Sequence, residues 1–264
     1  MTTESAQPSG NERGSRRIWW WRTGLVVAFL AAWEAVAGLG WIRPIFISSP
    51  SRIVQAAVWL AGKDLWHDLA VSGVEFLYGM LLAVVVGLLL GIVFGWYGSL
   101  GAAVDPFIAG LYATPRVALI PLIVLWFGIG IASKVAVVFL GAVFPILVST
   151  MAGVRAVDND LVTCARSFGA SDRQVFRTLA LPSSVPFIIA GLQLGVGRGL
   201  VGVVVAEFIA ARAGIGHMIA VAAATFQSDK TFVGILILAG TGVLLSSLLG
   251  RLQKRFDRWR PTQR

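Results

Sequence analysis

Few residues of this chain could do chemistry, because its charged side chains stand singly in long apolar stretches. Five ionisable residues interrupt those stretches: Glu34, Glu75, Arg116, Arg198 and Glu207. Neither arginine has an acidic residue three or four positions away, so neither can pair within its own helix. A guanidinium offers a fork of hydrogen-bond donors that suits an anion. The two arginines therefore predict a path for an anion across a membrane, with Glu207 as a third candidate lining residue.

Two alternatives remain open for these residues. Arg198 could instead be structural, either paired with Glu34 or Glu75 on a neighbouring helix or snorkelling beside the glycine face of its own helix. Glu207 could make a polar contact between helices near the outer end of its span. Arg198 and Glu207 are nine residues apart, so at about 100° per residue they lie on opposite faces of a helix and need different partners.

The spacing of the polar residues argues against an enzyme. Intramembrane enzymes need paired titratable groups that face one cavity, and this sequence has no histidine pair and no glycine loop of the Walker type. His67 stands near Asp64 and Asp68, but a solvated loop histidine is the better interpretation because no second ligand pair has matching spacing. We predict no catalytic residue, no metal and no cofactor.

The composition indicates that the chain lies in a bilayer. Of its 264 residues 57% are hydrophobic and 13% are charged, and the mean hydropathy is +0.81. A spanning helix needs about 20 predominantly apolar residues. The predicted fold is an all-α polytopic membrane protein with six transmembrane helices, at 24–42, 71–97, 107–132, 135–154, 185–211 and 232–250. The third is the least regular, because Pro115, Arg116 and Pro121 interrupt it.

The distribution of basic residues predicts the orientation. With the N-terminus inside, fourteen arginines and lysines fall in cytoplasmic segments and six, Lys134 among them, fall outside. The positive-inside rule then places both termini in the cytoplasm. The net charge of +9 follows from this topology, and we predict no nucleic-acid partner. We expect a disordered cytoplasmic tail over 1–23, a transmembrane domain over 24–250 and a basic cytoplasmic tail over 251–264.

Small residues predict how some elements begin and pack. Glycines recur every four residues in the second and fifth spans, at Gly87, Gly91, Gly95, Gly191, Gly195 and Gly199. Such a face lets another helix approach closely. Ser49 followed by Pro50 predicts the start of a further helix after the first span.

A cytoplasmic helical hairpin is predicted over 155–182, between the fourth and fifth spans. Asp158 or Asp160 can cap its first helix, which has one apolar stripe. The stripe consists of Val157, Leu161, Cys164, Ala165 and Phe168. Gly169 supplies the positive φ that ends this helix.

The second helix of the hairpin has its own start and stop signals. Ser171 with Gln174 three residues later forms a capping-box pattern. Pro182 disfavours a helical predecessor, so we expect this helix to end near Leu181. A hairpin this short cannot bury its own core, so its apolar stripe must pack against the membrane helices or against a partner.

The hairpin resembles the signature loop of ATP-binding-cassette (ABC) importer permeases. That loop reads Glu-Ala-Ala, three residues, Gly, nine residues, Ile, any residue, Leu, Pro. Ala165, Gly169, Leu179, Leu181 and Pro182 stand at matching offsets, whereas Thr163 and Cys164 replace the first two motif residues and Leu179 replaces isoleucine. The ATPase-coupling residues implied are Thr163, Cys164, Ala165, Arg166, Ser167, Phe168, Gly169, Ala170, Ser171, Leu179, Leu181 and Pro182.

The resemblance extends from about Trp33 to Trp259. The segments "SSPSRIVQA", "VVAEFIAARAGIGHMI" and "DKTFVGILILAGTGVLLSSLLGRLQKRFDRW" look like the nitrate, sulfonate and taurine branch of these permeases. The resemblance implies a multi-pass subunit of the bacterial cell (inner) membrane that pairs with a second permease subunit. A homodimer is expected, and a heterodimer is the alternative. The resemblance also implies two cytoplasmic ABC ATPase subunits, which hydrolyse the ATP, and an extracytoplasmic solute-binding protein.

The solute implied is a small anion such as an aliphatic sulfonate, taurine or nitrate. Two alternatives remain: an importer permease for a neutral or heterocyclic solute such as a pyrimidine precursor, and a stand-alone secondary transporter. A secondary transporter would be expected to show inverted repeats and no amphipathic cytoplasmic hairpin.

Overall fold

Long helices dominate the structure, a computed structural model that describes residues 10–40, 43 and 46–256. Four described helical segments are long and apolar enough to cross a membrane. They are α3 (Leu65–Trp96), α6 (Ile131–Arg155), the segment Asp172–Ala210, and α11 (Ser228–Phe256), which qualifies over Ser228–Gln253. The prediction of an all-α polytopic membrane protein is confirmed.

The third expected span is not one straight helix. α4 (Gly98–Ala113) and α5 (Arg116–Phe127) meet at an angle of 89°. Thr114 between them is extended, with φ −63° and ψ 129°, because Pro115 disfavours the helical conformation in the residue before it. Pro121 lies inside α5 without ending it. The bend makes this segment a fifth candidate span or a re-entrant loop.

The first helix begins earlier than expected. α1 spans Gly10–Gly38, so residues 10–23 are helical in this structure where the sequence predicted a disordered tail over 1–23, and residues 1–9 lie outside the described range. No proline occurs between Pro8 and Pro44, and a helix that has formed adds each further residue at little cost. α1 is not among the four long apolar helices.

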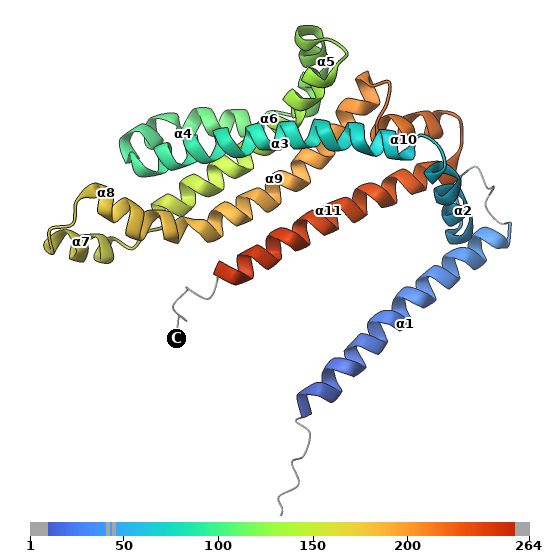
Figure 1. Cartoon of the computed structure of the whole chain (residues 1–264), viewed down its shortest axis with the longest axis horizontal. Coiled ribbons are helices and arrows are strands. Elements are labelled where there is room, and N and C mark those ends of the chain that lie inside the picture. The colour runs from blue at the N-terminus through green and yellow to red at the C-terminus, as the bar shows by residue number, and fades with distance from the viewer. Residues whose placement is uncertain (1–9, 41–42, 44–45, 257–264) are drawn as a thin grey trace, which may run out of the picture.

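Three helices form the packed centre of the molecule. α3 and α9 (Leu181–Ala210) both pack along α6, and the three run side by side in Figure 1. The expected close packing of the glycine faces is confirmed. A Cβ added to Gly91 would lie 2.6 Å from Cβ of Thr150, and one added to Gly191 would lie 2.7 Å from Cβ of Ser149. Only glycine lets these helices come so close.

A second core lies at the end of the molecule that carries α2 (Pro50–Ala61) and α10 (Ile215–Ala224). Ser49 caps α2 as predicted, and its hydroxyl accepts a hydrogen bond from the Arg52 N–H. Ile53 and Leu60 on the inner face of α2 are buried against α10 and α11.

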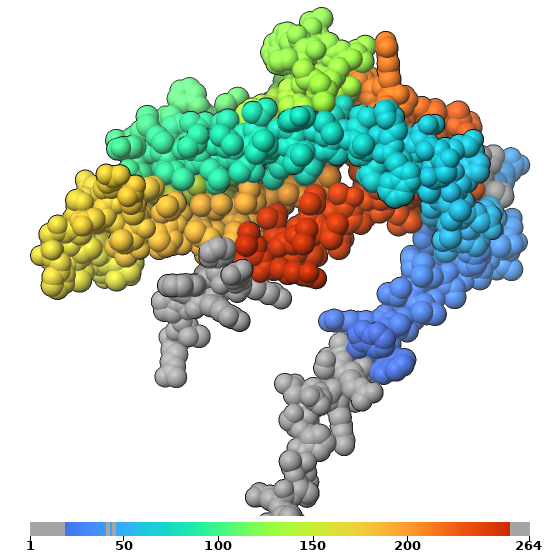
Figure 2. All heavy atoms as spheres, viewed as in Figure 1, coloured from blue at the N-terminus to red at the C-terminus, as the bar shows by residue number. Residues whose placement is uncertain are grey.

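α1 is attached to the rest of the molecule near its C-terminal end. The Trp33 indole donates to the Ser48 carbonyl at 2.8 Å, and the Glu34 carboxylate accepts from the Ser51 N–H and hydroxyl at 3.0 and 2.7 Å. Over most of its length α1 stands clear of α11 (Figure 2). Its apolar side chains, such as Leu25 and Phe29, are exposed.

Candidate functional site

The two arginines singled out by the sequence line one cavity of about 410 Å³. It lies where the break between α4 and α5 meets α6 and α9. Its lining includes Tyr112, Thr114, Arg116, Val137, Gly141, Arg198, Val201, Gly202 and Val205. Arg116 comes from the first position of α5, and Arg198 comes from the middle of α9. The cavity is otherwise largely apolar, so these two cations dominate its electrostatics.

The Arg116 guanidinium is positioned by its neighbours and keeps a spare donor. Its Nη2 donates to the Tyr112 carbonyl at 3.2 Å. The guanidinium carbon lies 5.2 Å from the ring centroid of Tyr112 and 5.5 Å from that of Phe144, within the range of cation–π attraction. The Nε atom is buried and has no hydrogen-bond partner. A buried donor of this kind is costly unless it is satisfied, and an anion in the cavity would satisfy it.

No acid neutralises either arginine within residues 10–40, 43 and 46–256, where neither arginine takes part in an ion pair. The carboxylates considered as alternative partners of Arg198 are engaged elsewhere: Glu34 binds Ser51, and Glu75 pairs with Lys134. Arg116 also stands at the positive end of the α5 dipole. The charges around the cavity thus favour an anion.

Glu207 lies outside this cavity, and its hydrogen-bond partners are not among the lining residues. Its side chain is 1% exposed and does not line the cavity. The carboxylate accepts from the Ser72 hydroxyl and from the Gly216 N–H, each at 2.6 Å. A Cβ at Gly216 would lie 2.7 Å from Glu207 Oε2, so glycine is required there. Glu207 therefore joins α3, α9 and the first turn of α10, which is the polar contact between helices considered above.

Further polar contacts hold the same end of α10. Asp68 accepts from the Gly214 N–H, and the Ser72 hydroxyl accepts from the Ile215 N–H, both at 2.8 Å.

Lys134, which the topology placed among the outer loop residues, is instead buried, 3.8 Å from a carboxylate oxygen of Glu75. A buried lysine needs such a partner, and this partner comes from a distant helix, so no local sequence signal reveals the pair.

The first helix of the predicted hairpin has the expected caps. α7 (Asn159–Ser167) begins after Asp158, whose carboxylate accepts from the Asp160 N–H at 2.8 Å. Gly169 has a φ of +81°, as its position required. The capping box is confirmed: Gln174 Oε1 accepts from the Ser171 N–H at 2.7 Å.

The apolar stripe of the hairpin's first helix is largely exposed in the described part of the chain, with only Val157 and Ala165 half-buried. Phe168 is 88% exposed and Leu161 is 55% exposed. Cys164 is an exposed free thiol. Thr163 replaces the motif glutamate, and its hydroxyl donates a hydrogen bond to the Asn159 carbonyl of the same helix. The stripe is thus available to a partner.

The second helix of the hairpin does not end at Leu181, contrary to the prediction from Pro182. α8 (Asp172–Val175) continues through a π-turn (Phe176–Ala180) into α9, and the whole segment Asp172–Ala210 is helical. In the π-turn the Leu181 N–H bonds to the Phe176 carbonyl five residues earlier. This wider turn accommodates the proline ring, which clashes with a preceding carbonyl in a regular helix.

The hairpin is also anchored to the packed centre. The Phe176 ring makes an edge-to-face contact with Trp96 at the end of α3, with centroids 5.0 Å apart. Val175 and Ala180 are buried. These contacts hold the hairpin against the end of α3. The unbroken helix Asp172–Ala210 also connects it to α9, the helix that carries Arg198.

Long apolar helices around a cation-lined cavity define a multi-pass membrane permease. The chain belongs to the family described as "Binding-protein-dependent transport system inner membrane component", whose sequence profile matches residues 83–260. It is thus an inner-membrane permease subunit of an importer, and its partner subunits are considered below.

Curated relatives agree with this assignment, and a solved structure shares the fold. The chain is 34% identical over 242 residues to the taurine transport system permease protein TauC of Escherichia coli, covering 89% of this chain and 88% of that protein. It is 32% identical over 253 residues to the putative aliphatic sulfonates transport permease protein SsuC of Bacillus subtilis, covering 94% and 91%. A chain of an inward-facing MetNI methionine ABC transporter shares the fold, with a TM-score of 0.55, 19% identity and coverage of 76% of this chain and 95% of that one.

Proposed function

We propose that this chain forms the passage of an ABC importer for a small anion of the aliphatic sulfonate or taurine type. The observation that carries the proposal is the shared cavity of Arg116 and Arg198, in which the buried Nε of Arg116 has no partner. A sulfonate has a negative charge and three acceptor oxygens, which suit two guanidinium groups. The names of the taurine and sulfonate relatives support the same solute class.

The hairpin 155–182 is proposed as the contact with one of two cytoplasmic ABC ATPase subunits, each of which receives one such hairpin. Its support is the exposed apolar stripe with Leu161 and Phe168, together with the helix that continues from the hairpin to Arg198. A rigid connection can carry a movement of the ATPase to the cavity, whereas a flexible loop cannot. ATP hydrolysis then belongs to the partner, and this subunit supplies the passage.

The remaining assembly is proposed from the family and from the charge pattern. Both termini lie in the cytoplasm, α1 and the bent α4–α5 segment complete six spans, and two copies of the chain enclose the path as a homodimer. An extracytoplasmic binding protein delivers the solute. The exposed apolar faces of α1 and α3 support burial in lipid or against a second copy.

The test is transport by the assembled importer in proteoliposomes, with radiolabelled taurine and an alkanesulfonate as solutes. Arg198→Gln should abolish most uptake while the complex still assembles, and Arg198→Lys should retain part of it. Arg212→Gln is the control, because this exposed arginine lies outside the cavity. Normal uptake by Arg198→Gln would contradict the proposal.

A further inference from the structure

Three ionisable side chains are buried together among α3, α6 and α9. Glu75 of α3 is 3% exposed, Lys134 of α6 is 5% exposed and Glu207 of α9 is 1% exposed. All three belong to helical segments long and apolar enough to cross a membrane, where an uncompensated charge is costly. The passage proposed for the solute uses none of them, so the charges of this group must balance among themselves.

The carboxyl groups of Glu75 and Glu207 lie against each other. Ser72 and Glu75 are three residues apart and share one face of α3, and the Ser72 hydroxyl donates to Glu207 Oε1 at 2.6 Å. The side chains of Glu75 and Glu207 are themselves within hydrogen-bonding reach. An ionised carboxylate can only accept hydrogen bonds, so a hydrogen bond between the two requires a proton on one of them.

The charges of the group also call for one proton. Lys134 lies close to both carboxyls, and its single positive charge would leave a net negative charge if both were ionised. Two carboxylates that share one site retain a proton for this reason. The Lys134 Nζ lies 3.8 Å from Glu75 Oε1, beyond hydrogen-bond range, which fits attraction to the pair as a whole. With one proton the group is neutral.

The hydrogen bonds show which carboxyl carries the proton. Both oxygens of Glu207 accept, one from the Ser72 hydroxyl and one from the Gly216 N–H, each at 2.6 Å. Bonds this short are typical of an ionised acceptor. Glu75 Oε2 is buried, and no donor in the described part of the chain bonds to it. Glu75 is therefore the acid, and Glu207 is the carboxylate.

A bound metal ion explains the pair less well than a proton. No group of three or more His, Cys, Asp or Glu side chains suited to a metal occurs in the described part of the chain. The ammonium group of Lys134 would repel a second cation beside it. Backbone also closes around Glu207, since a Cβ added to Gly216 would lie 2.7 Å from its Oε2. A proton needs no such space.

Other charged groups on the neighbouring helices are engaged elsewhere. Asp68 of α3 accepts from the Gly214 N–H at 2.8 Å. Arg198 of α9 lines the cavity beside α5. His217 of α10 lines a separate hollow with Asp64. None of them forms an ion pair with the buried group in the parts of the chain that the structure describes.

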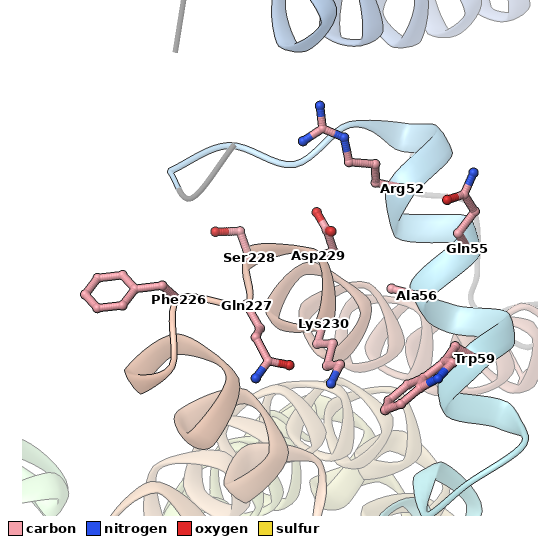
Figure 3. A pocket seen from close by; sticks show the side chains of 9 residues that line it. All are labelled: Arg52, Gln55, Ala56, Trp59, Phe226, Gln227, Ser228, Asp229 and Lys230. Carbon is pink, nitrogen blue, oxygen red and sulfur yellow. The ribbon is translucent and has the colours of Figure 1, made fainter. Parts of the chain in front are cut away.

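The charges at the start of α11 are also separate from the pair. Figure 3 shows Arg52, Asp229 and Lys230 around a hollow of about 650 Å³ between α2 and α11. Asp229 accepts from the Ser48 hydroxyl at 2.6 Å. Neither member of the pair lines this hollow. The charge balance thus rests on the two carboxyls and one ammonium group.

We infer that Glu75 and Glu207 form a proton-binding site, in which Glu75 carries the proton and donates it in a hydrogen bond to Glu207. Together with Lys134 the proton makes the buried group neutral, and the hydrogen bond joins α3 to α9. Because Glu207 also binds the first turn of α10, the site holds three helices together. The site requires neither a solute nor a partner subunit.

The test is infrared difference spectroscopy of the full-length subunit in detergent at about pH 8, where exposed carboxyls are ionised. A protonated carboxyl gives a carbonyl band that is distinct from the bands of carboxylates. Glu75→Gln keeps the shape and neutrality of a protonated glutamate, and its amide can donate to Glu207. We expect this variant to lose the band while its melting temperature stays within about 2 °C of wild type.

Glu207→Gln tests whether the proton is shared. Without the carboxylate of residue 207, Glu75 should ionise beside Lys134, so the band should be lost here too. The melting temperature should fall by about 4 °C or more, because the amide cannot accept from both Ser72 and Gly216.

Glu34→Gln is the control, because Glu34 already accepts two hydrogen bonds from Ser51, and the band should be unchanged. Absence of the band from wild type would show that both carboxyls are ionised. A band that survives Glu75→Gln or Glu207→Gln would show that the pair does not hold the proton. A Glu75→Gln protein that melts as low as Glu207→Gln would make Glu75 an ionised partner of Lys134. Each of these results would overturn the inference.

Discussion

The carboxylate of Glu207 accepts a hydrogen bond of 2.6 Å from the backbone N–H of Gly216 and so closes the N-terminus of α10. The second oxygen of the same carboxylate accepts from the Ser72 hydroxyl of α3. One buried side chain therefore fixes three helices at the end of the molecule that carries α2 and α10. An N–H at a helix start needs such an acceptor when water is excluded.

Removal of this carboxylate should destabilise the protein. Glu207→Ala leaves the Ser72 hydroxyl and the Gly216 N–H buried without their acceptor, which should cost about 3 kcal/mol of unfolding free energy. Glu207→Gln keeps one acceptor oxygen and should cost less. The measurement is thermal unfolding in detergent. Glu34→Ala is the control, because that carboxylate accepts from Ser51 near the surface, where water can replace the lost acceptor, and we expect a clearly smaller loss. A Glu207→Ala protein as stable as wild type would contradict this role.

Gly216 should not accept even a methyl group. In Gly216→Ala the new Cβ would meet Glu207 Oε2 at 2.7 Å and the Val204 carbonyl at 2.8 Å. We expect a loss of about 1–3 kcal/mol in unfolding free energy. Gly197→Ala in α9 is the matched control: nothing lies within 4 Å of its added Cβ, and alanine in a helix should be neutral or stabilise by up to about 1 kcal/mol. Equal melting temperatures for the two variants would contradict the steric argument.

The turn of the hairpin should depend on Gly169. Its φ of +81° penalises a β-branched residue, at a cost of about 1–2 kcal/mol that falls on the turn. Gly169→Val should insert and accumulate normally, while uptake is lost and ATPase association weakens. Gly169→Asn should keep much of the uptake, since asparagine tolerates this conformation. Full uptake by Gly169→Val would remove the turn from the mechanism.

Cys164 tests the topology, because it is the one cysteine of the chain and its side chain is exposed. A membrane-impermeant maleimide should label it in inverted vesicles once the ATPase is stripped, and intact cells should stay unlabelled. Cys164→Ser serves as the blank. Labelling of intact cells from outside would show that the hairpin faces the cell exterior, and it would contradict the predicted topology.

Local sequence features determined much of this protein. Runs of apolar residues predicted long helices, because a backbone in lipid must satisfy its own hydrogen bonds. Ser49, Gly169 and the Ser171–Gln174 pair marked helix ends correctly, since caps depend on residues a few positions apart. The spacing of glycine and proline in the hairpin indicated the family.

Other features were decided by contacts between distant residues. Pro182 predicts a helix end, yet a π-turn lets the helix continue, because Phe176 packs on Trp96 and Val175 is buried. Lys134 and Glu75 come from separate helices, and only tertiary structure pairs them. Arg116 and Arg198 were each visible in the sequence, but their shared cavity arises from the bend between α4 and α5 and the packing of α9 on α6. Sequence periodicity reports the face of one helix, whereas a cavity depends on how several helices are placed together.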